Sequence, residues 1–195
     1  DFAVLMRINA LTRSFEQEVT KYNIPYKVFG GLKFFERKEI KDVLAYLRLI
    51  SNPYDNEALT RIINVPRRGI GGKTVEAMEE YAAKNGLSLY DAVFDCDELP
   101  LNSGLKSKLA DFGKTIKDLI ISSIESPVNA FVRQVIDATG LREGLEDEND
   151  LANVDEFVAS VDDFSRLNPN ATLSEYLSQV TLYSDTDEMD ESNYV

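Results

Sequence analysis

Apolar residues recur at helical spacing along most of this chain. Positions 40, 43, 44, 47 and 50 are all aliphatic, which predicts an amphipathic helix that ends before Pro53. The same spacing predicts helices over residues 11–22, 56–64, 72–84, 88–94, 105–119, 128–136 and 151–164. A last helix is expected to open at Thr172, which forms a capping box with Glu175. The fold is therefore predicted to be mainly α.

Two stretches near the start depart from this pattern. Residues 2–8 form a nearly continuous apolar run, as in a strand covered on both faces, and residues 26–29 form a second strand candidate. With the helix predicted between them, they give a strand–helix–strand unit. A buried strand needs neighbours, and no other good candidate follows. We therefore expect an incomplete sheet and a chain that is a piece of a larger protein.

A basic stretch broken by glycines lies directly before one of the predicted helices. It runs Val65-Pro66-Arg67-Arg68-Gly69-Ile70-Gly71-Gly72-Lys73-Thr74. Glycines let the backbone come close to a ligand, and the first turn of a helix presents unpaired N–H groups that favour an anion. The stretch is therefore predicted to grip phosphate. The alternative is a plain connection between helices with solvated arginines, since short glycine-rich turns before helices are common.

Charge is divided unevenly between the two halves of the sequence. The 195 residues carry a net charge of -13, but residues 1–90 hold 14 Lys and Arg against 11 Asp and Glu. Residues 91–195 hold the other 7 Lys and Arg against 23 Asp and Glu, a net charge of -16. A DNA-binding face is therefore expected only in the first half, where the net charge is positive.

Composition excludes several kinds of chemistry. With one cysteine and no histidine, the chain can form no internal disulfide, zinc cluster or histidine-dependent triad. Cys96 lies among acidic neighbours that should raise the pKa of its thiol and blunt its reactivity. The acidic run from Asp185 lacks the glycine that a calcium loop needs at its sixth position, so no metal site is predicted. No apolar run approaches the roughly 20 residues of a membrane span, which predicts a cytosolic protein.

Two further groups of polar residues are candidates for binding or for contacts between subdomains. Asn9 and Arg13 lie at the start of the first predicted helix, where side chains and N–H groups can meet a phosphate. The alternative there is helix capping by Asn9 or Thr12 with a solvated Arg13. Residues 36–42 mix charges of both signs at helical spacing, which fits either a surface network or a polar contact between two subdomains.

Several segments together resemble one family closely. They are Leu5–Arg13, Ile24–Tyr26, Gly30–Asp42 and Tyr46–Arg48. In these segments the chain resembles the UvrD/PcrA/Rep-type superfamily 1 DNA helicases. Pro66–Gly71 matches that family's Pro-x-Arg-Gly-Ile-Gly element, and Asn153–Phe157 and Ser184–Met189 match its later landmarks. The resemblance therefore runs from one end of the sequence to the other.

The resemblance implies a division of the chain into three parts. In such helicases two RecA-like motor subdomains, 1A and 2A, each carry an inserted helical subdomain, 1B and 2B. Residues 1–31 resemble the opening of 2A, residues 32–183 the helical 2B subdomain, and residues 184–195 an acidic return segment toward 2A. By the same resemblance, Glu36, Arg37 and Lys41 are expected at the hinge between 2A and 2B.

The resemblance also implies which residues contact DNA. Asn9 and Arg13 correspond to the 2A motif that faces the single strand, and Gly69 to Gly71 correspond to the 2B element that grips the duplex backbone ahead of the fork. With their neighbours, the expected DNA-binding set is Asn9, Arg13, Arg67, Arg68, Gly69, Ile70, Gly71, Gly72, Lys73 and Thr74. The family commonly has Gln-Ser at residues 11 and 12, so a polar contact from residue 11 is lost or moved in this chain.

The intact protein is then expected to be an ATP-dependent 3′-to-5′ DNA helicase of repair or replication. It would be cytoplasmic and associated with the bacterial nucleoid, would bind single- and double-stranded DNA without regard to sequence, and would use ATP and Mg²⁺. This piece contains no GxxxxGK[ST] loop, so it is expected to bind duplex and regulate unwinding but to hydrolyse nothing. Two interpretations stay open: an acidic helical module that binds protein partners, and the helicase part of a helicase–nuclease subunit of the AddA type.

Overall fold

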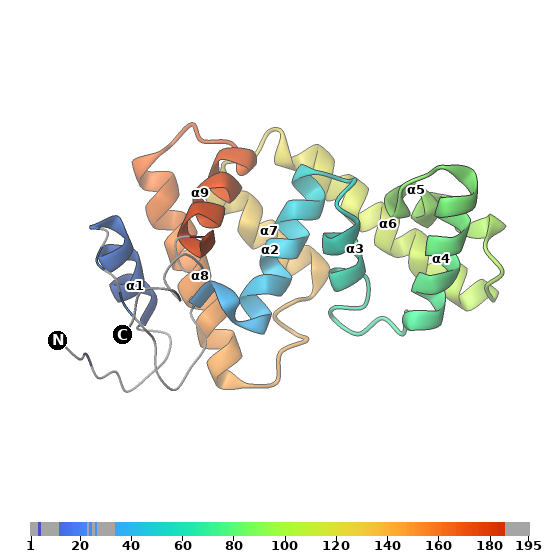
Figure 1. The fold of residues 1–195 in the computed structure, drawn as a ribbon, viewed down its shortest axis with the longest axis horizontal. Helices are drawn as coiled ribbons and strands as arrows, with labels where there is room; N and C mark the ends of the chain where they lie inside the picture. Colours follow the sequence, from blue (N-terminus) through green and yellow to red (C-terminus); the bar gives the residue numbers. More distant parts are fainter. Residues whose placement is uncertain (1–3, 5–11, 23, 25, 27–33, 186–195) are drawn as a thin grey trace, which may run out of the picture.

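The computed structural model describes residues 4, 12–22, 24, 26 and 34–185. All regular structure among these residues is helical, which confirms the mainly α fold. The two predicted strands lie outside the described residues except for Val4 and Tyr26, so the RecA-like strand–helix–strand unit stays a prediction. Figure 1 shows an elongated molecule with α1, α8 and α9 at one end and α4, α5 and α6 at the other.

The helices follow the predicted order. They are α1 (Thr12–Lys21), α2 (Lys38–Ser51), α3 (Asn56–Ile62), α4 (Gly72–Asn85), α5 (Leu89–Phe94), α6 (Ser103–Ser123), α7 (Val128–Thr139), α8 (Glu148–Leu167) and α9 (Leu173–Asp185). Two short 3-10 helices, η2 (Phe34–Glu36) and η3 (Cys96–Glu98), were not expected from the pattern. The predicted capping box is confirmed, because the Thr172 N–H donates to Glu175 Oε2 at 2.7 Å and the Glu175 N–H donates to Thr172 Oγ1 at 3.3 Å.

Helix α2 lies at the centre of the molecule (Figure 1). It contacts α3, α6, α7, α8 and α9, and Leu47 and Leu49 on it are fully buried. The sequence predicted one apolar stripe on this helix, but burial extends around it to Ala45 and Tyr46. A helix with so wide a buried surface, which leaves only positions such as Lys41 and Arg48 exposed, is typical of the core of a domain rather than of its surface.

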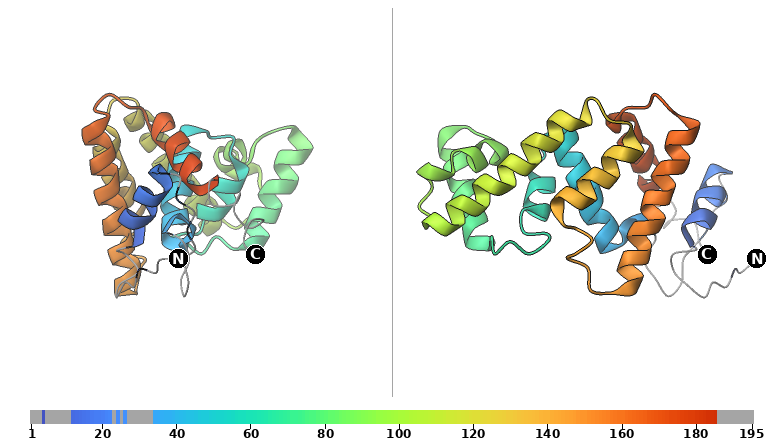
Figure 2. Two further views of the ribbon diagram at one scale, coloured as in Figure 1. Left: turned by 60° about the vertical axis from the view of Figure 1, so that its left-hand side comes forward. Right: turned by 180° about the vertical axis from the view of Figure 1, so that it is seen from behind.

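At the far end from α1, helices α4 and α5 pack beside the long helix α6 (Figure 2). The close approach of α5 and α6 depends on Gly113, since a Cβ atom there would lie 2.8 Å from Val93 Cγ1. Cys96 is buried beneath this end, and burial together with the Asp97 charge raises the pKa of its thiol. The expected inert role of Cys96 is consistent with this environment.

Helix α6 offers a matched pair of isoleucines for testing the core. Ile116 is fully buried, whereas Ile121 in the same helix is 59% exposed. We expect Ile116→Ala to lower the free energy of unfolding by about 2–5 kcal/mol, because the change removes buried methyl groups and leaves a cavity. Ile121→Ala should change it by less than about 0.5 kcal/mol. Urea unfolding of both variants measures the difference, and equal losses would contradict this packing.

Candidate nucleic-acid interface

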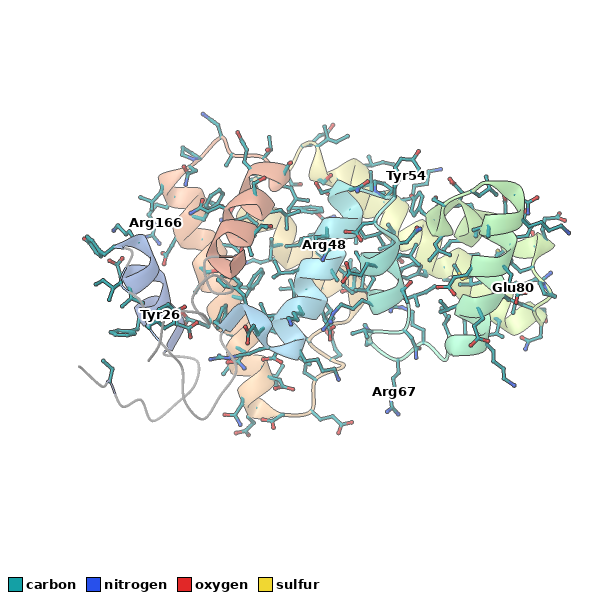
Figure 3. The ribbon with its side chains drawn as sticks, in the orientation of Figure 1. Tyr26, Arg48, Tyr54, Arg67, Glu80 and Arg166 are labelled. Carbon is teal, nitrogen blue, oxygen red and sulfur yellow. The ribbon has the colours of Figure 1, made fainter. Side chains whose placement is uncertain are left out.

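The loop that joins α3 to α4 projects from the surface between the two halves of the molecule. Arg67 lies near its middle and is exposed, and its side chain points away from the ribbon (Figure 3). Gly69 has a φ of 74°, in the left-handed region that favours glycine. The sequence prediction of a glycine-dependent turn with an exposed arginine therefore has a counterpart in the geometry.

The backbone of this loop is fastened by the side chain of Asn64. Its Oδ1 atom accepts hydrogen bonds from the Arg68 N–H at 2.8 Å and from the Ile70 N–H at 3.2 Å. These two N–H groups are therefore hydrogen-bonded within the protein and are not available to a ligand. Asn64 sets the path of the turn, although the sequence analysis gave it no role.

At the start of α4, several backbone N–H groups face solvent. Gly71 is the N-cap residue, with extended geometry, and no side chain caps the helix. The Gly71 carbonyl accepts from the N–H groups of Thr74 and Val75 at 2.9 and 3.3 Å. Among the described residues, no acceptor engages the N–H groups of Gly71, Gly72 and Lys73, and all three residues are exposed. A 14-residue helix with open N–H groups at its start favours a phosphate oxygen there.

The second arginine of the loop turns the opposite way from the first. Arg68 Nη1 donates to the carbonyl oxygens of Val65, Ile62 and Pro66 at 2.8, 3.2 and 3.2 Å. Its Nη2 atom donates to Tyr46 Oη at 2.7 Å and to the Thr139 carbonyl at 3.3 Å. The guanidinium also lies 5.5 Å from the centre of the Phe112 ring. The sequence counted Arg68 among the phosphate ligands, whereas its guanidinium faces the protein interior.

Two other members of the expected set are also turned inward. Ile70 is 1% exposed and belongs to the hydrophobic core, and Thr74 is 3% exposed. Their side chains anchor the turn and the first turn of α4, so any contact with DNA would have to come from their neighbours. The outward-facing members of the loop are Arg67, Gly69, Gly71, Gly72 and Lys73.

Lys108 on α6 joins this surface from a distant part of the sequence. A Cβ atom built at Gly69 would lie 2.8 Å from Lys108 Nζ, so the ammonium group reaches the turn itself. Lys108 is exposed. The sequence analysis missed it because α6 lies in the acidic half of the chain and no local motif surrounds it. With Arg67 and Lys73, Lys108 adds a third cation to the loop surface.

The other two predicted DNA-binding residues, Asn9 and Arg13, belong to the start of the chain. Asn9 lies outside the described residues. Arg13 lies in α1, at the opposite end of the molecule from α4 (Figure 1), and its side chain is not described. The structure therefore does not bring the single-strand motif and the loop together.

The expected hinge residues differ sharply in their surroundings. Glu36 and Lys41 are exposed, whereas Arg37 is 7% exposed. Arg37 Nη1 donates to Asn153 Oδ1 on α8 at 2.6 Å, and the Asn153 amide donates to Glu39 Oε1 at 2.6 Å. The sequence suggested a surface network at this place, but the structure has a buried one. Asn153 was recognised only as part of a family landmark, without this role.

The buried network connects to α1 through a carboxylate. Glu16 on α1 is 7% exposed, and its Oε2 atom accepts from the Phe34 N–H of η2 at 3.2 Å. Burial lowers the pKa of Arg37, while the charges of Glu16 and Glu39 act to raise it. The guanidinium therefore stands between two carboxylates, one on α1 and one on α2, beside the Phe34 ring at 5.1 Å.

No cluster of three potential metal ligands occurs among the described residues. In the same part of the chain, no helix combines the length and apolar character that crossing a bilayer requires.

Comparison with known sequences defines the class of protein. The profile of the UvrD-like helicase C-terminal domain matches residues 1–195. The chain belongs to this family, as a segment of a UvrD/PcrA-type superfamily 1 helicase.

Individual relatives agree with this assignment. The chain is 38% identical over 203 residues to the ATP-dependent DNA helicase PcrA of Staphylococcus aureus, with 100% of this chain and 28% of the relative covered. It is 36% identical over 197 residues to PcrA of Bacillus subtilis, with 98% of this chain and 27% of the relative covered. The chain thus spans about 28% of the length of the curated relatives it matches.

The tyrosine beneath the loop provides a test of this geometry. Burial is the main cause that raises the pKa of Tyr46 to about 12, and the Arg68 charge opposes it. The unfolded value is about 10. The preference for the neutral phenol therefore stabilises the fold below pH about 10, and this stabilisation is lost as the pH rises through about 12.

We expect the ultraviolet titration difference between the wild type and Tyr46→Phe to show one phenol that ionises near pH 12. Circular dichroism at each pH establishes that both proteins are still folded. A difference that titrates near pH 10 would mean that Tyr46 is open to solvent and that the packing under the loop is wrong.

Proposed function

We propose that this chain is the duplex-binding and regulatory part of an ATP-dependent 3′-to-5′ DNA helicase. The main observation is the loop surface, which combines the exposed Arg67 and Lys73, Lys108 beside Gly69, and the open N–H groups at the start of α4. Both kinds of group bind phosphate oxygens, and contacts to phosphate carry no sequence information. A contact that ignores sequence suits an enzyme that unwinds any duplex it meets.

The rest of the helicase cycle belongs to other parts of the intact protein. We assign residues 1–31 to subdomain 2A, residues 32–183 to subdomain 2B and residues 184–195 to the return toward 2A. ATP and Mg²⁺ would bind at the motor subdomains, since this sequence contains no GxxxxGK[ST] loop. Asn9 and Arg13 would face the single strand, on the motor side of the molecule. The relatives' names support ATP-dependent DNA unwinding as the activity of the whole protein.

Duplex binding is expected to depend on Arg67 and on ionic strength. Wild-type chain should bind short duplexes of unrelated sequence equally, with dissociation constants on the order of 10⁻⁴–10⁻⁶ M, as is typical of non-specific binding. Arg67→Glu should weaken binding. It should also make the plot of log K against log salt less steep, by about 0.9 in the magnitude of its slope, because one phosphate contact is lost. Fluorescence anisotropy at several salt concentrations measures both quantities.

A matched charge reversal at a distant site controls for the change in net charge. Arg166 lies on α8 at the other end of the molecule (Figure 3), is exposed, and pairs with Asp163 at 2.9 Å. Arg166→Glu alters net charge as Arg67→Glu does and should leave the salt slope unchanged. Absence of wild-type binding at low salt would instead favour a module that binds proteins through its acidic surface.

We further assign the buried network around Arg37 to the hinge between 2A and 2B. It is the place where α1, which would belong to 2A, meets the helical part. Because Glu16 links α1 to η2 and its charge faces Arg37, breaking this contact leaves a buried guanidinium with one carboxylate fewer. The orientation of α1 against α8 should then become less defined.

Two glutamates on α1 allow the hinge assignment to be tested. Glu16 is buried, whereas Glu18 is exposed and pairs with Lys21 at 3.6 Å. Spin labels at Tyr22→Cys, directly after α1, and Arg166→Cys on α8, in a Cys96→Ala background, report the distance between the two helices. We expect Glu16→Ala to broaden the distance distribution and Glu18→Ala to leave it narrow. Equal distributions in both variants would remove Glu16 from the hinge.

A further inference from the structure

Two adjacent arginines in the loop point in opposite directions. Arg67 is exposed, whereas the Arg68 guanidinium reaches five acceptors inside the protein. Both terminal nitrogens of the Arg68 guanidinium are thus engaged by carbonyl and hydroxyl oxygens inside the protein and are not available to a phosphate. The two arginines therefore differ in what their side chains can bind, although they are the same residue type.

The acceptors of Arg68 come from three separate places in the fold. Ile62, Val65 and Pro66 surround the end of α3, Tyr46 lies on the central helix α2, and Thr139 is the last residue of α7. Arg68 thus joins the loop to α2 and α7. Without it, the Pro66 and Thr139 carbonyls would lose a donor, and this is costly. The Ile62 carbonyl would keep the Val65 N–H, and the Val65 carbonyl would keep the Tyr46 hydroxyl.

A second contact fixes the loop from the same side. Pro66 packs against the turn after α7, so closely that a Cβ atom built at Gly144 would lie 2.7 Å from Pro66 Cβ. Gly140, at the end of α7, would place a Cβ atom 3.9 Å from Pro66 Cγ. The loop is therefore docked onto the corner between α7 and α8 by one polar contact and one packing contact.

We propose that Arg68 is a positioning residue for duplex binding and not a phosphate ligand. It holds the loop on the corner after α7, so that Arg67, Lys73 and Lys108 and the open N–H groups of α4 share one surface. This inference rests on the proposed function. Holding the loop in place before DNA arrives reduces the ordering cost of binding, so Arg68 contributes to affinity without touching the ligand.

The salt dependence of duplex binding separates positioning from contact. Arg67→Gln should reduce the magnitude of the slope of log K against log salt by about 0.9. Arg67→Lys should restore the wild-type slope, because a lysine also neutralises phosphate. Arg68→Gln should leave the slope unchanged, because no phosphate contact is lost, but should weaken binding on the order of tenfold. Arg68→Lys should weaken binding to a similar extent, because an ammonium group cannot replace the planar fork that spans five acceptors.

A variant that changes no charge tests loop docking independently of whether Arg68→Lys folds. Gly144→Ala forces Pro66 to shift and should also weaken binding with an unchanged slope. Gly104→Ala is the matched control, since its Cβ atom would lie 3.3 Å from Asn102 Oδ1, the N-cap atom of α6, and would touch nothing of the loop. Binding by the control should equal that of the wild type.

Hydrogen exchange measures loop docking without DNA. The amide protons of Arg68 and Ile70, which are bonded to Asn64, should exchange faster in Arg68→Lys and Gly144→Ala than in the wild type. A salt slope made less steep by Arg68→Gln as much as by Arg67→Gln would overturn the inference, and so would unchanged exchange. If the wild type binds no duplex, the proposed function fails, and the exchange rates alone decide whether Arg68 positions the loop.

Discussion

Helix α2 is buried over most of its surface, and the polar groups on its buried faces must therefore find partners inside the protein, whereas Lys41 and Arg48 reach solvent. Three such groups, Glu39, Asp42 and Tyr46, are spaced so that they share one face of the helix. The Asn153 amide donates to Glu39 at 2.6 Å, Arg61 pairs with Asp42 at 2.8 Å, and Arg68 donates to Tyr46 at 2.7 Å. An unpaired polar group at these depths would cost several times what each bond contributes.

The three bonds attach three different parts of the molecule to one element. Asn153 belongs to α8 beside the proposed hinge, Arg61 to α3, and Arg68 to the loop of the proposed duplex surface. The polar face of α2 thus runs from the hinge to the loop. The contacts at Glu39 and Tyr46 are about two turns apart on one helix, so the two sites are attached to a single rigid element rather than to a flexible connection.

The helices could be predicted because the spacing of their apolar residues is local in the sequence. The contacts that individual polar side chains make could not be predicted in this way. Nothing in the order Arg67-Arg68 tells which guanidinium faces solvent, since the carbonyls that bind Arg68 come from α3, the loop and α7. Lys108 was missed because its place beside Gly69 depends on how α6 crosses the loop. The Arg37 network was taken as a surface feature, because the partner Asn153 is remote in sequence.

Removing Arg68 from the set of phosphate ligands limits how strongly the loop can bind. Three cations remain, Arg67, Lys73 and Lys108, together with the N–H groups of α4. Three neutralised phosphates correspond to a salt slope of about -2.7, which is much less steep than the slope of tight DNA-binding proteins. A weak grip suits a surface that must release duplex at each step of a moving enzyme. The inward arginine strengthens this grip by fixing the geometry of the loop, without adding a charge that would slow release.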